Sequence, residues 1–198
     1  LRDQGNNVAH EASMVKLFCT ETASRIADKA MDIFENDGYL KKFQIEMYLR
    51  DVRLYRIFEG TSEIQQSIIS TFRWKETRKT KGEFYAAICR EMGDMDKDVK
   101  DAGCRFYGLS AGILNNAIML VHDNRLMRQQ HVMFSLAYMM TYVEVGASLA
   151  RKAVALSKSG DPEAKKMKAM SRIFADEVVQ LVSRNALNIL MGSGIFDQ

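Results

Sequence analysis

The sequence contains a single proline, Pro162, and only twelve glycines among its 198 residues. Proline and glycine are the strongest breakers of regular structure, so their scarcity favours long helices over a β fold with many turns. No stretch of period-two alternation is long enough to predict a strand. The sequence therefore predicts an all-α fold.

Cysteine is equally scarce. Cys19, Cys89 and Cys104 are odd in number and lack the spacing of metal ligands, so we expect free thiols in a reducing compartment and no metal site. No signal peptide opens the chain. The most apolar run, Val132 to Val143, has about twelve residues, fewer than the about 20 that a bilayer-spanning helix needs. We expect a location in the bacterial cytoplasm or, as a second choice, in the mitochondrial matrix.

The chain also lacks a strong excess of charge of one sign. The net charge is +3, and the densest basic run, Arg73 to Lys81, has no stacking aromatics and belongs to no recognised nucleic-acid module. We interpret this run as a solvated linker and expect no nucleic-acid partner. The composition, 47% hydrophobic and 27% charged, is that of a soluble globular protein.

Apolar residues recur at helical spacing along most of the chain. Gly38 is expected to end the first helix in a left-handed cap, and Thr61 or Ser62 to cap the helix after it. The tripeptide Gly192-Ser193-Gly194 fits either a loop that approaches a phosphate or a helix C-cap, and we favour the cap. The expected helices cover residues 9–34, 45–50, 63–73, 83–100, 103–123, 126–157 and 163–190.

Residues 14–39 align without gaps with residues 170–195 at a constant offset of 156. Two amphipathic helices can resemble one another through their period alone, but the match includes identical residues beyond the apolar period. We therefore predict an internal duplication. The aligned pairs include Met14 with Met170, Lys16 with Arg172, Leu17 with Ile173, Phe18 with Phe174, Glu21 with Glu177, Ala30 with Ala186, Ile33 with Ile189 and Gly38 with Gly194.

The segment Phe58 to Gln65 is the most specific motif of the chain. It combines a lone carboxylate at Glu59, the flexible Gly60 and a Thr61-x-Glu63 spacing that can cap a helix, and Arg50-Asp51 precedes it. This pattern resembles the base loop of the flavin-dependent acyl-CoA dehydrogenases. The segments Met14-x-Lys16-Leu17-Phe18, Ile33-Phe34 and Gly38-Tyr39 also match the last part of that family's C-terminal helical domain.

The resemblance implies roles for five residues. Glu59 would remove the α-proton of a fatty acyl-CoA thioester, Phe58 and Gly60 would lie at the substrate pocket, and Thr61 and Glu63 would contact FAD. A base of this kind works only when its carboxylate is desolvated and the enolate oxygen meets prepared donors. The alternatives for Glu59 are an exposed loop carboxylate and a first-turn residue favoured by the helix dipole. The three histidines, His10, His122 and His131, are interpreted as surface or core residues.

The family resemblance also implies partners and an organisation into domains. Residues 1–75 would be the latter half of the C-terminal helical domain, 76–82 a linker and 83–198 an extra, degenerate copy of the same bundle. This layout is most similar to the very-long-chain type, whose added bundle is linked to dimerisation and membrane association. We expect an electron-transfer flavoprotein as electron acceptor and a homo-oligomer, a dimer or a tetramer.

One departure from the family pattern bears on the cofactor. Where the family usually carries Gly-Gly close to the flavin nucleotide of a neighbouring subunit, this chain has Glu35-Asn36. This replacement argues against conventional FAD binding by this segment. The resemblance also implies that the family's β-domain, its N-terminal helical domain and the first helices of its C-terminal bundle are missing from this sequence, so we expect a fragment that is inactive by itself and does not bind FAD tightly. The alternative is a non-enzymatic helical module for dimerisation or membrane docking, in which the loop around Glu59 is a relic.

Overall fold

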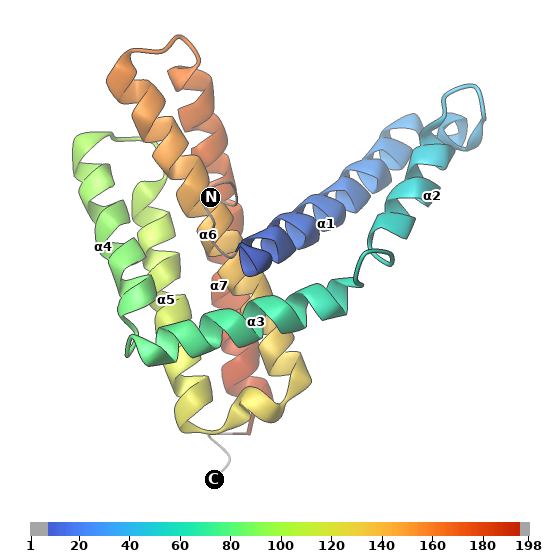
Figure 1. The fold of residues 1–198 in the computed structure, drawn as a ribbon. Helices are drawn as coiled ribbons and strands as arrows, with labels where there is room; N and C mark the ends of the chain where they lie inside the picture. Colours follow the sequence, from blue (N-terminus) through green and yellow to red (C-terminus); the bar gives the residue numbers. More distant parts are fainter. Residues whose placement is uncertain (1–7, 195–198) are drawn as a thin grey trace. The chain divides into compact units, whose positions relative to one another are not determined.

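The computed structural model describes residues 8–194, and within them every regular element is a helix (Figure 1). The predicted all-α fold is confirmed. The chain divides into two compact units, Leu1–Ile69 and Ser70–Gln198. The boundary lies inside helix α3 (Ser62–Lys79), which contributes residues to both units.

The first unit is built on a helical hairpin. Helix α1 (Ala9–Phe34) continues into a 3₁₀ helix, η2 (Glu35–Tyr39), and then returns as α2 (Ile45–Tyr55), which packs against α1. A short segment after α2 leads into α3 and carries Glu59. This arrangement places the loop of the sequence motif beside α1.

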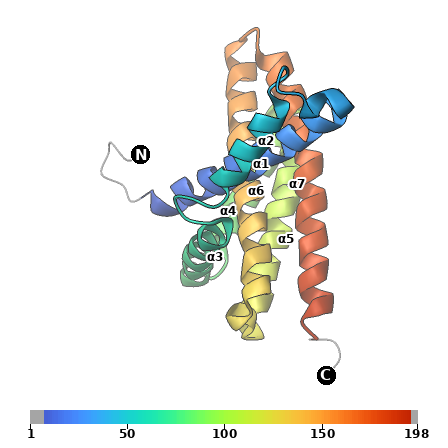
Figure 2. The same ribbon diagram turned by 90° about the vertical axis from the view of Figure 1, so that its right-hand side faces the viewer.

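The second unit is a four-helix bundle. Helix α5 (Cys104–Asp123) packs against α4 (Glu83–Asp98), α6 (Gln130–Ser159) and α7 (Ala164–Gly192), and α6 also packs along α7 (Figure 2). A 3₁₀ turn, η3 (Leu126–Arg128), joins α5 to α6. The core is made of large side chains that are fully buried, among them Tyr85, Met92, Tyr107, Leu114, Ile118, Leu136, Met139 and Met140.

Helix α6 is longer than the apolar run from Val132 to Val143 that the sequence shows. By length and composition it is apolar enough to cross a membrane, although 56% of its most apolar window is buried in the structure. Tyr142, Ala147 and Val154 are among its buried residues. We therefore interpret α6 as the core helix of the second unit.

The expected helices agree with the observed ones within three residues at each end except in three places. Helix α2 continues to Tyr55, five residues beyond its expected end at Arg50, and α6 begins at Gln130, after the 3₁₀ turn η3 that occupies the expected start. The third difference is in α3. That helix continues to Lys79, so residues 74–79, which we expected to be a solvated linker, are helical. Lysine, arginine and glutamate are good helix formers, and threonine does not prevent a helix that packing supports. The run is also not fully solvated, because Arg73 is only 5% exposed.

The end of α1 differs from the sequence prediction. Glu35, and not Gly38, takes the positive φ, with φ 47° and ψ −127°. Gly38 is buried in η2, where an added Cβ would lie 3.0 Å from Met31 Sδ and 3.4 Å from Phe34 Cβ. The prediction of a left-handed cap at Gly38 was wrong, since the glycine is needed for close packing. At the end of α7, by contrast, Gly194 has φ 66°, as the C-cap interpretation expects.

Candidate functional site

The loop between α2 and α3 is a short turn closed by backbone hydrogen bonds. The Ser62 N–H donates to the Arg56 carbonyl at 3.1 Å, and the Gln65 side-chain amide donates to the Glu59 carbonyl at 3.1 Å. Glu59 and Gly60 have φ values of 55° and 89°. An added Cβ on Gly60 would lie 2.5 Å from Gln65 Nε2, so both its conformation and its surroundings favour glycine. We call residues 56–62 the base loop.

Helix α1 holds this base loop at three points. Lys16 Nζ donates a hydrogen bond of 2.7 Å to the Gly60 carbonyl. Glu21 Oε1 accepts from Arg56 Nε at 2.9 Å and from Ser62 Oγ at 2.7 Å. Lys16 and Glu21 lie more than 30 residues away in sequence, so the motif alone gave no signal for these contacts. Two hints are present in the sequence: both residues align with like residues in the repeat, and Lys16 lies in a segment that matches the family.

The Glu59 side chain itself is exposed. Its carboxylate has no hydrogen-bond or ion-pair partner within residues 8–194, while its backbone is fixed on both sides. Phe58 is 45% exposed and lies against Tyr55, with ring centroids 5.7 Å apart. In this loop the Glu59 and Gly60 carbonyls are held by hydrogen bonds, while the side chains of Phe58 and Glu59 are exposed.

Thr61 and Glu63 lie at the start of α3. Thr61 Oγ1 accepts a long hydrogen bond, 3.4 Å, from the Ile64 N–H, so Thr61 is the N-cap that the sequence predicts. The Glu63 backbone N–H, and then the Thr61 hydroxyl, hold the pKa of the Glu63 carboxyl below its usual value. A small cavity of about 100 Å³ opens here, lined by Arg53, Arg56, Ile57, Thr61, Ser62 and Glu63.

The cavity at the start of α3 carries charges of both signs. Arg53 and the Thr61 hydroxyl lie there at the positive end of the helix dipole, but Arg56 is paired with Glu21 and the Glu63 carboxylate lines the same cavity. Glu35, the residue that departs from the expected glycine, is exposed and has a positive φ, a conformation that favours glycine.

The Arg50-Asp51 pair of the motif contributes no contact with the base loop. Arg50 pairs with Glu46 one turn earlier on α2 at 3.1 Å, and Asp51 is exposed. Among residues 8–194, no three His, Cys, Asp or Glu side chains are grouped so that they could hold a metal ion.

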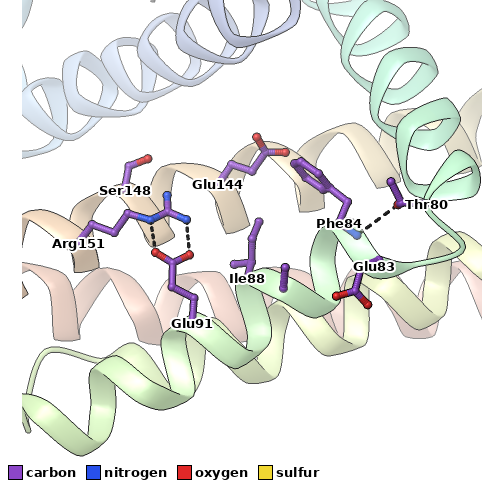
Figure 3. A pocket seen from close by; sticks show the side chains of 9 residues that line it. Thr80, Glu83, Phe84, Ile88, Glu91, Glu144, Ser148 and Arg151 are labelled. Carbon is purple, nitrogen blue, oxygen red and sulfur yellow. Dashed lines mark hydrogen bonds and ion pairs between the residues drawn. The ribbon is translucent and has the colours of Figure 1, made fainter.

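A larger cavity of about 570 Å³ lies in the second unit, between α4 and α6 (Figure 3). Apolar side chains such as Phe84 and Ile88 form part of its wall. Arg151 and Glu91 also line it and form a bidentate ion pair, in which Arg151 Nε and Nη2 each lie 2.7 Å from a Glu91 oxygen. Arg151 holds the pKa of the Glu91 carboxyl below its usual value.

Glu144, which also lines this cavity, is engaged by other side chains. Arg73 donates two hydrogen bonds to its carboxylate, at 2.8 and 2.6 Å, and the Tyr85 hydroxyl donates a third at 2.8 Å. Burial lowers the pKa of Arg73, but the bonds and charge of Glu144 outweigh it and raise that pKa overall. Burial, and then the charge of Glu144, raise the pKa of Tyr85. The carboxylates of Glu91 and Glu144 are therefore committed to structural pairs, whereas the Glu59 carboxylate is exposed.

Known proteins resemble about a third of the chain in sequence. An acyl-CoA dehydrogenase of Bacillus subtilis is 42% identical over 72 residues, which are 36% of this chain and 19% of that protein. The caffeyl-CoA reductase-Etf complex subunit CarC of Acetobacterium woodii is 41% identical over 70 residues, 35% of this chain and 18% of that protein. The mouse mitochondrial very long-chain specific acyl-CoA dehydrogenase is 38% identical over 69 residues, 34% of this chain and 10% of that protein.

The chain spans about a fifth of the length of the first two of these relatives. A solved structure, an acyl-CoA dehydrogenase of Bacillus anthracis complexed with FAD, matches with a TM-score of 0.68 at 21% identity. The match covers 93% of this chain and 33% of that one, and at this identity it shows the fold alone. The family model for the acyl-CoA dehydrogenase C-terminal domain matches residues 1–72 and 103–198, most of the sequence. The chain therefore belongs to the acyl-CoA dehydrogenase C-terminal domain family.

Proposed function

We propose that this chain is the C-terminal part of a longer acyl-CoA dehydrogenase, here called the parent enzyme, in which Glu59 is the base that removes the α-proton of an acyl-CoA. The observation that carries the proposal is the base loop. Its backbone is held from α1 and by Gln65, and the carboxylate of Glu59 is exposed without a partner among the described residues.

The chemistry requires this combination of a fixed backbone and a mobile carboxylate. The α-proton of a thioester is weakly acidic, so the base must sit close to it, away from water, with its pKa raised toward the working pH. Phe58, next to Glu59 and 45% exposed here, supplies apolar surface that would exclude water once the acyl chain and the rest of the parent enzyme close over the loop. The proton then resides on a Glu59 carboxylate oxygen.

FAD, when bound, supplies the acceptor for the hydride that leaves the β-carbon. Thr61 and Arg53 would hold an anionic part of it at the start of α3, while Arg56 is engaged by Glu21. Electrons would pass to an electron-transfer flavoprotein, an expectation supported by the relative named as a subunit of an Etf complex.

An exposed apolar face on α1 supports the view that a longer parent exists. The residues of α7 that pack in the bundle, among them Val182 and Ile189, are 0% and 2% exposed. At the offset of 156, they correspond to Ile26 and Ile33 of α1, which are 64% and 78% exposed. We infer that the parent covers this face with helices equivalent to α5 and α6. The isolated chain is therefore expected to be inactive.

The test is the visible spectrum of the purified parent enzyme before and after addition of acyl-CoAs of different chain lengths. We expect a flavin band that bleaches when a matching acyl-CoA is added without an electron acceptor. A parent that stays colourless after FAD is supplied, or whose flavin no acyl-CoA bleaches, would contradict the proposal.

The second candidate is a non-enzymatic helical module. One observation favours it, namely the strained and negatively charged Glu35 at a place where the family carries glycine near the flavin nucleotide. In that case the exposed apolar face of α1 would mediate self-association. A colourless parent that forms a stable dimer in analytical ultracentrifugation would support this second reading.

A further inference from the structure

Two charged residues of α1, Lys16 and Glu21, bind the base loop through side-chain hydrogen bonds. Their partners are the Gly60 carbonyl and the pair Arg56 and Ser62, at distances of 2.7 to 2.9 Å. These contacts join segments 35 to 44 residues apart in the chain. They lie within the first unit, and the Gln65 side-chain amide adds bonds to the Glu59 carbonyl at 3.1 Å and to the Gly60 carbonyl at 3.5 Å.

The loop needs such support because one of its residues, Glu59, has a backbone conformation that residues other than glycine rarely adopt. Glu59 has φ 55°, which is uncommon for a residue other than glycine, and Gly60 follows with φ 89°. Gly60 adopts its φ at no steric cost, but a residue such as Glu59 stays in this region only where its surroundings determine it. The Gly60 carbonyl is the acceptor that fixes this turn, since it receives the Lys16 ammonium at 2.7 Å.

The burial of the two side chains is consistent with a holding role. Glu21 is only 16% exposed although it carries a charge, and both bonds go to the same oxygen, Oε1. Lys16 is half-buried, in contrast to Lys29 on the same helix, whose side chain is 77% exposed and paired with Asp32. A hydrogen bond with a charged partner is among the stronger ones available to a side chain.

We propose that Lys16 and Glu21 are positioning residues for the base: they fix the loop backbone so that the Glu59 carboxylate moves from one defined point. This proposal rests on the proposed role of Glu59. Lys16 bonds to the carbonyl one residue after the base, and Glu21 fixes the two ends of the loop. A displacement of about 1 Å at a reacting group can lower a rate by about 100-fold. Loss of Lys16 should therefore act on the chemical step more than on substrate binding.

The first experiment measures the loop in this 198-residue chain. Hydrogen exchange of the Ser62 amide, which is bonded to the Arg56 carbonyl, reports whether the loop stays closed. In Lys16→Met we expect this exchange to be faster by about tenfold or more, which corresponds to about 1.4 kcal/mol of local stability. Lys16→Arg should restore most of the protection, and the control Lys29→Met should leave it unchanged. Equal exchange in Lys16→Met and wild type would overturn the proposal.

The second experiment measures single-turnover flavin reduction in the parent enzyme. We expect Lys16→Met and Glu21→Gln to reduce the rate by about 10- to 100-fold with little change in KM, and Lys16→Arg to recover much of it. A general loss of stability would instead lower the amount of folded enzyme and would not be corrected by arginine. Wild-type reduction rates in Lys16→Met would refute the positioning role. If the wild-type flavin is itself not reduced by any acyl-CoA, the proposed function fails, and the exchange experiment still decides whether Lys16 holds the loop.

Discussion

Gly146 of α6 offers a test of how α6 packs against Tyr107 of α5. A Cβ added at Gly146 would lie 2.3 and 2.6 Å from two ring carbons of Tyr107. Carbon atoms in contact prefer about 3.5 to 4.0 Å, so the overlap exceeds an ångström. The ring has little room to move, because Tyr107 is fully buried and its hydroxyl donates to the Ser171 carbonyl at 2.7 Å.

The magnitude follows from two opposing effects. Overpacking a core by one methyl group costs about 1 to 3 kcal/mol, and this overlap belongs at the upper end of that range. Replacement of a helical glycine by alanine contributes about 1 kcal/mol in the other direction. We expect Gly146→Ala to lower the free energy of unfolding by about 1 to 2 kcal/mol. The matched control is Gly93→Ala in α4, where an added Cβ meets no atom within 4 Å, so that it should raise stability by about 0.5 to 1 kcal/mol.

The assay is urea denaturation of both variants and the wild type, followed by circular dichroism. The predicted order of midpoints is Gly93→Ala, wild type, Gly146→Ala. The two variants should differ by about 2 kcal/mol, which is a factor of about 30 in the folding equilibrium. If Gly146→Ala is as stable as Gly93→Ala, Tyr107 does not fill the space beside α6 and the packing described for α5 and α6 is wrong.

Three further predictions concern strain and charge. Glu35→Gly should stabilise the end of α1. Relief of the strained backbone contributes about 1 to 3 kcal/mol, which exceeds the about 0.5 to 1 kcal/mol that glycine costs in conformational entropy. Slower amide hydrogen exchange at the end of α1 would confirm this prediction, and faster exchange would contradict it. Burial raises the pKa of Tyr107 to about 12, above its unfolded value of about 10, so its contribution to stability is present below pH 10 and is lost as pH rises toward 12. Alkaline unfolding curves of wild type and Tyr107→Phe should differ in slope over that interval, and parallel curves would refute the assignment. Glu144→Gln should destabilise the second unit by up to about 3 kcal/mol in urea denaturation, because it leaves Arg73 buried with a weaker partner, whereas a change below about 0.5 kcal/mol would show that the network contributes little.

Much of the fold could be predicted from the sequence because the helices carry clear local signals. The observed bounds of α5, Cys104–Asp123, and of α7, Ala164–Gly192, lie within two residues of the expected ones. Breakers and caps near their ends, such as Gly103 and Pro162, explain this agreement. The extent of α3 could not be predicted in this way. Arg73, at the point where the expected helix ended, pairs with Glu144, which lies 71 residues away, and the local sequence carries no signal for that contact.

In the candidate site, too, the residues with local roles could be predicted from the sequence and those with long-range contacts could not. The motif located Glu59, Gly60 and the N-cap Thr61, because their roles depend on neighbouring residues. The sequence aligned Lys16 and Glu21 with like residues in the repeat but indicated no function for either. An isolated lysine or glutamate on a helix ordinarily points into solvent, so such a residue alone predicts no contact. Only the fold brings α1 against the base loop. The domain division into residues 1–75 and 83–198 and the duplication remain predictions, and a solved structure of the parent enzyme would test both.

The central claim is that Glu59 is the base of an acyl-CoA dehydrogenase. The most direct measurement is anaerobic, single-turnover bleaching of the flavin in the parent enzyme, with Glu59→Gln compared against Glu46→Gln, a control on α2 outside the base loop. We predict that both variants retain flavin and bind the acyl-CoA. We expect Glu46→Gln to bleach at close to the wild-type rate and Glu59→Gln to bleach at least 100-fold more slowly. Bleaching of Glu59→Gln at the wild-type rate would contradict the account.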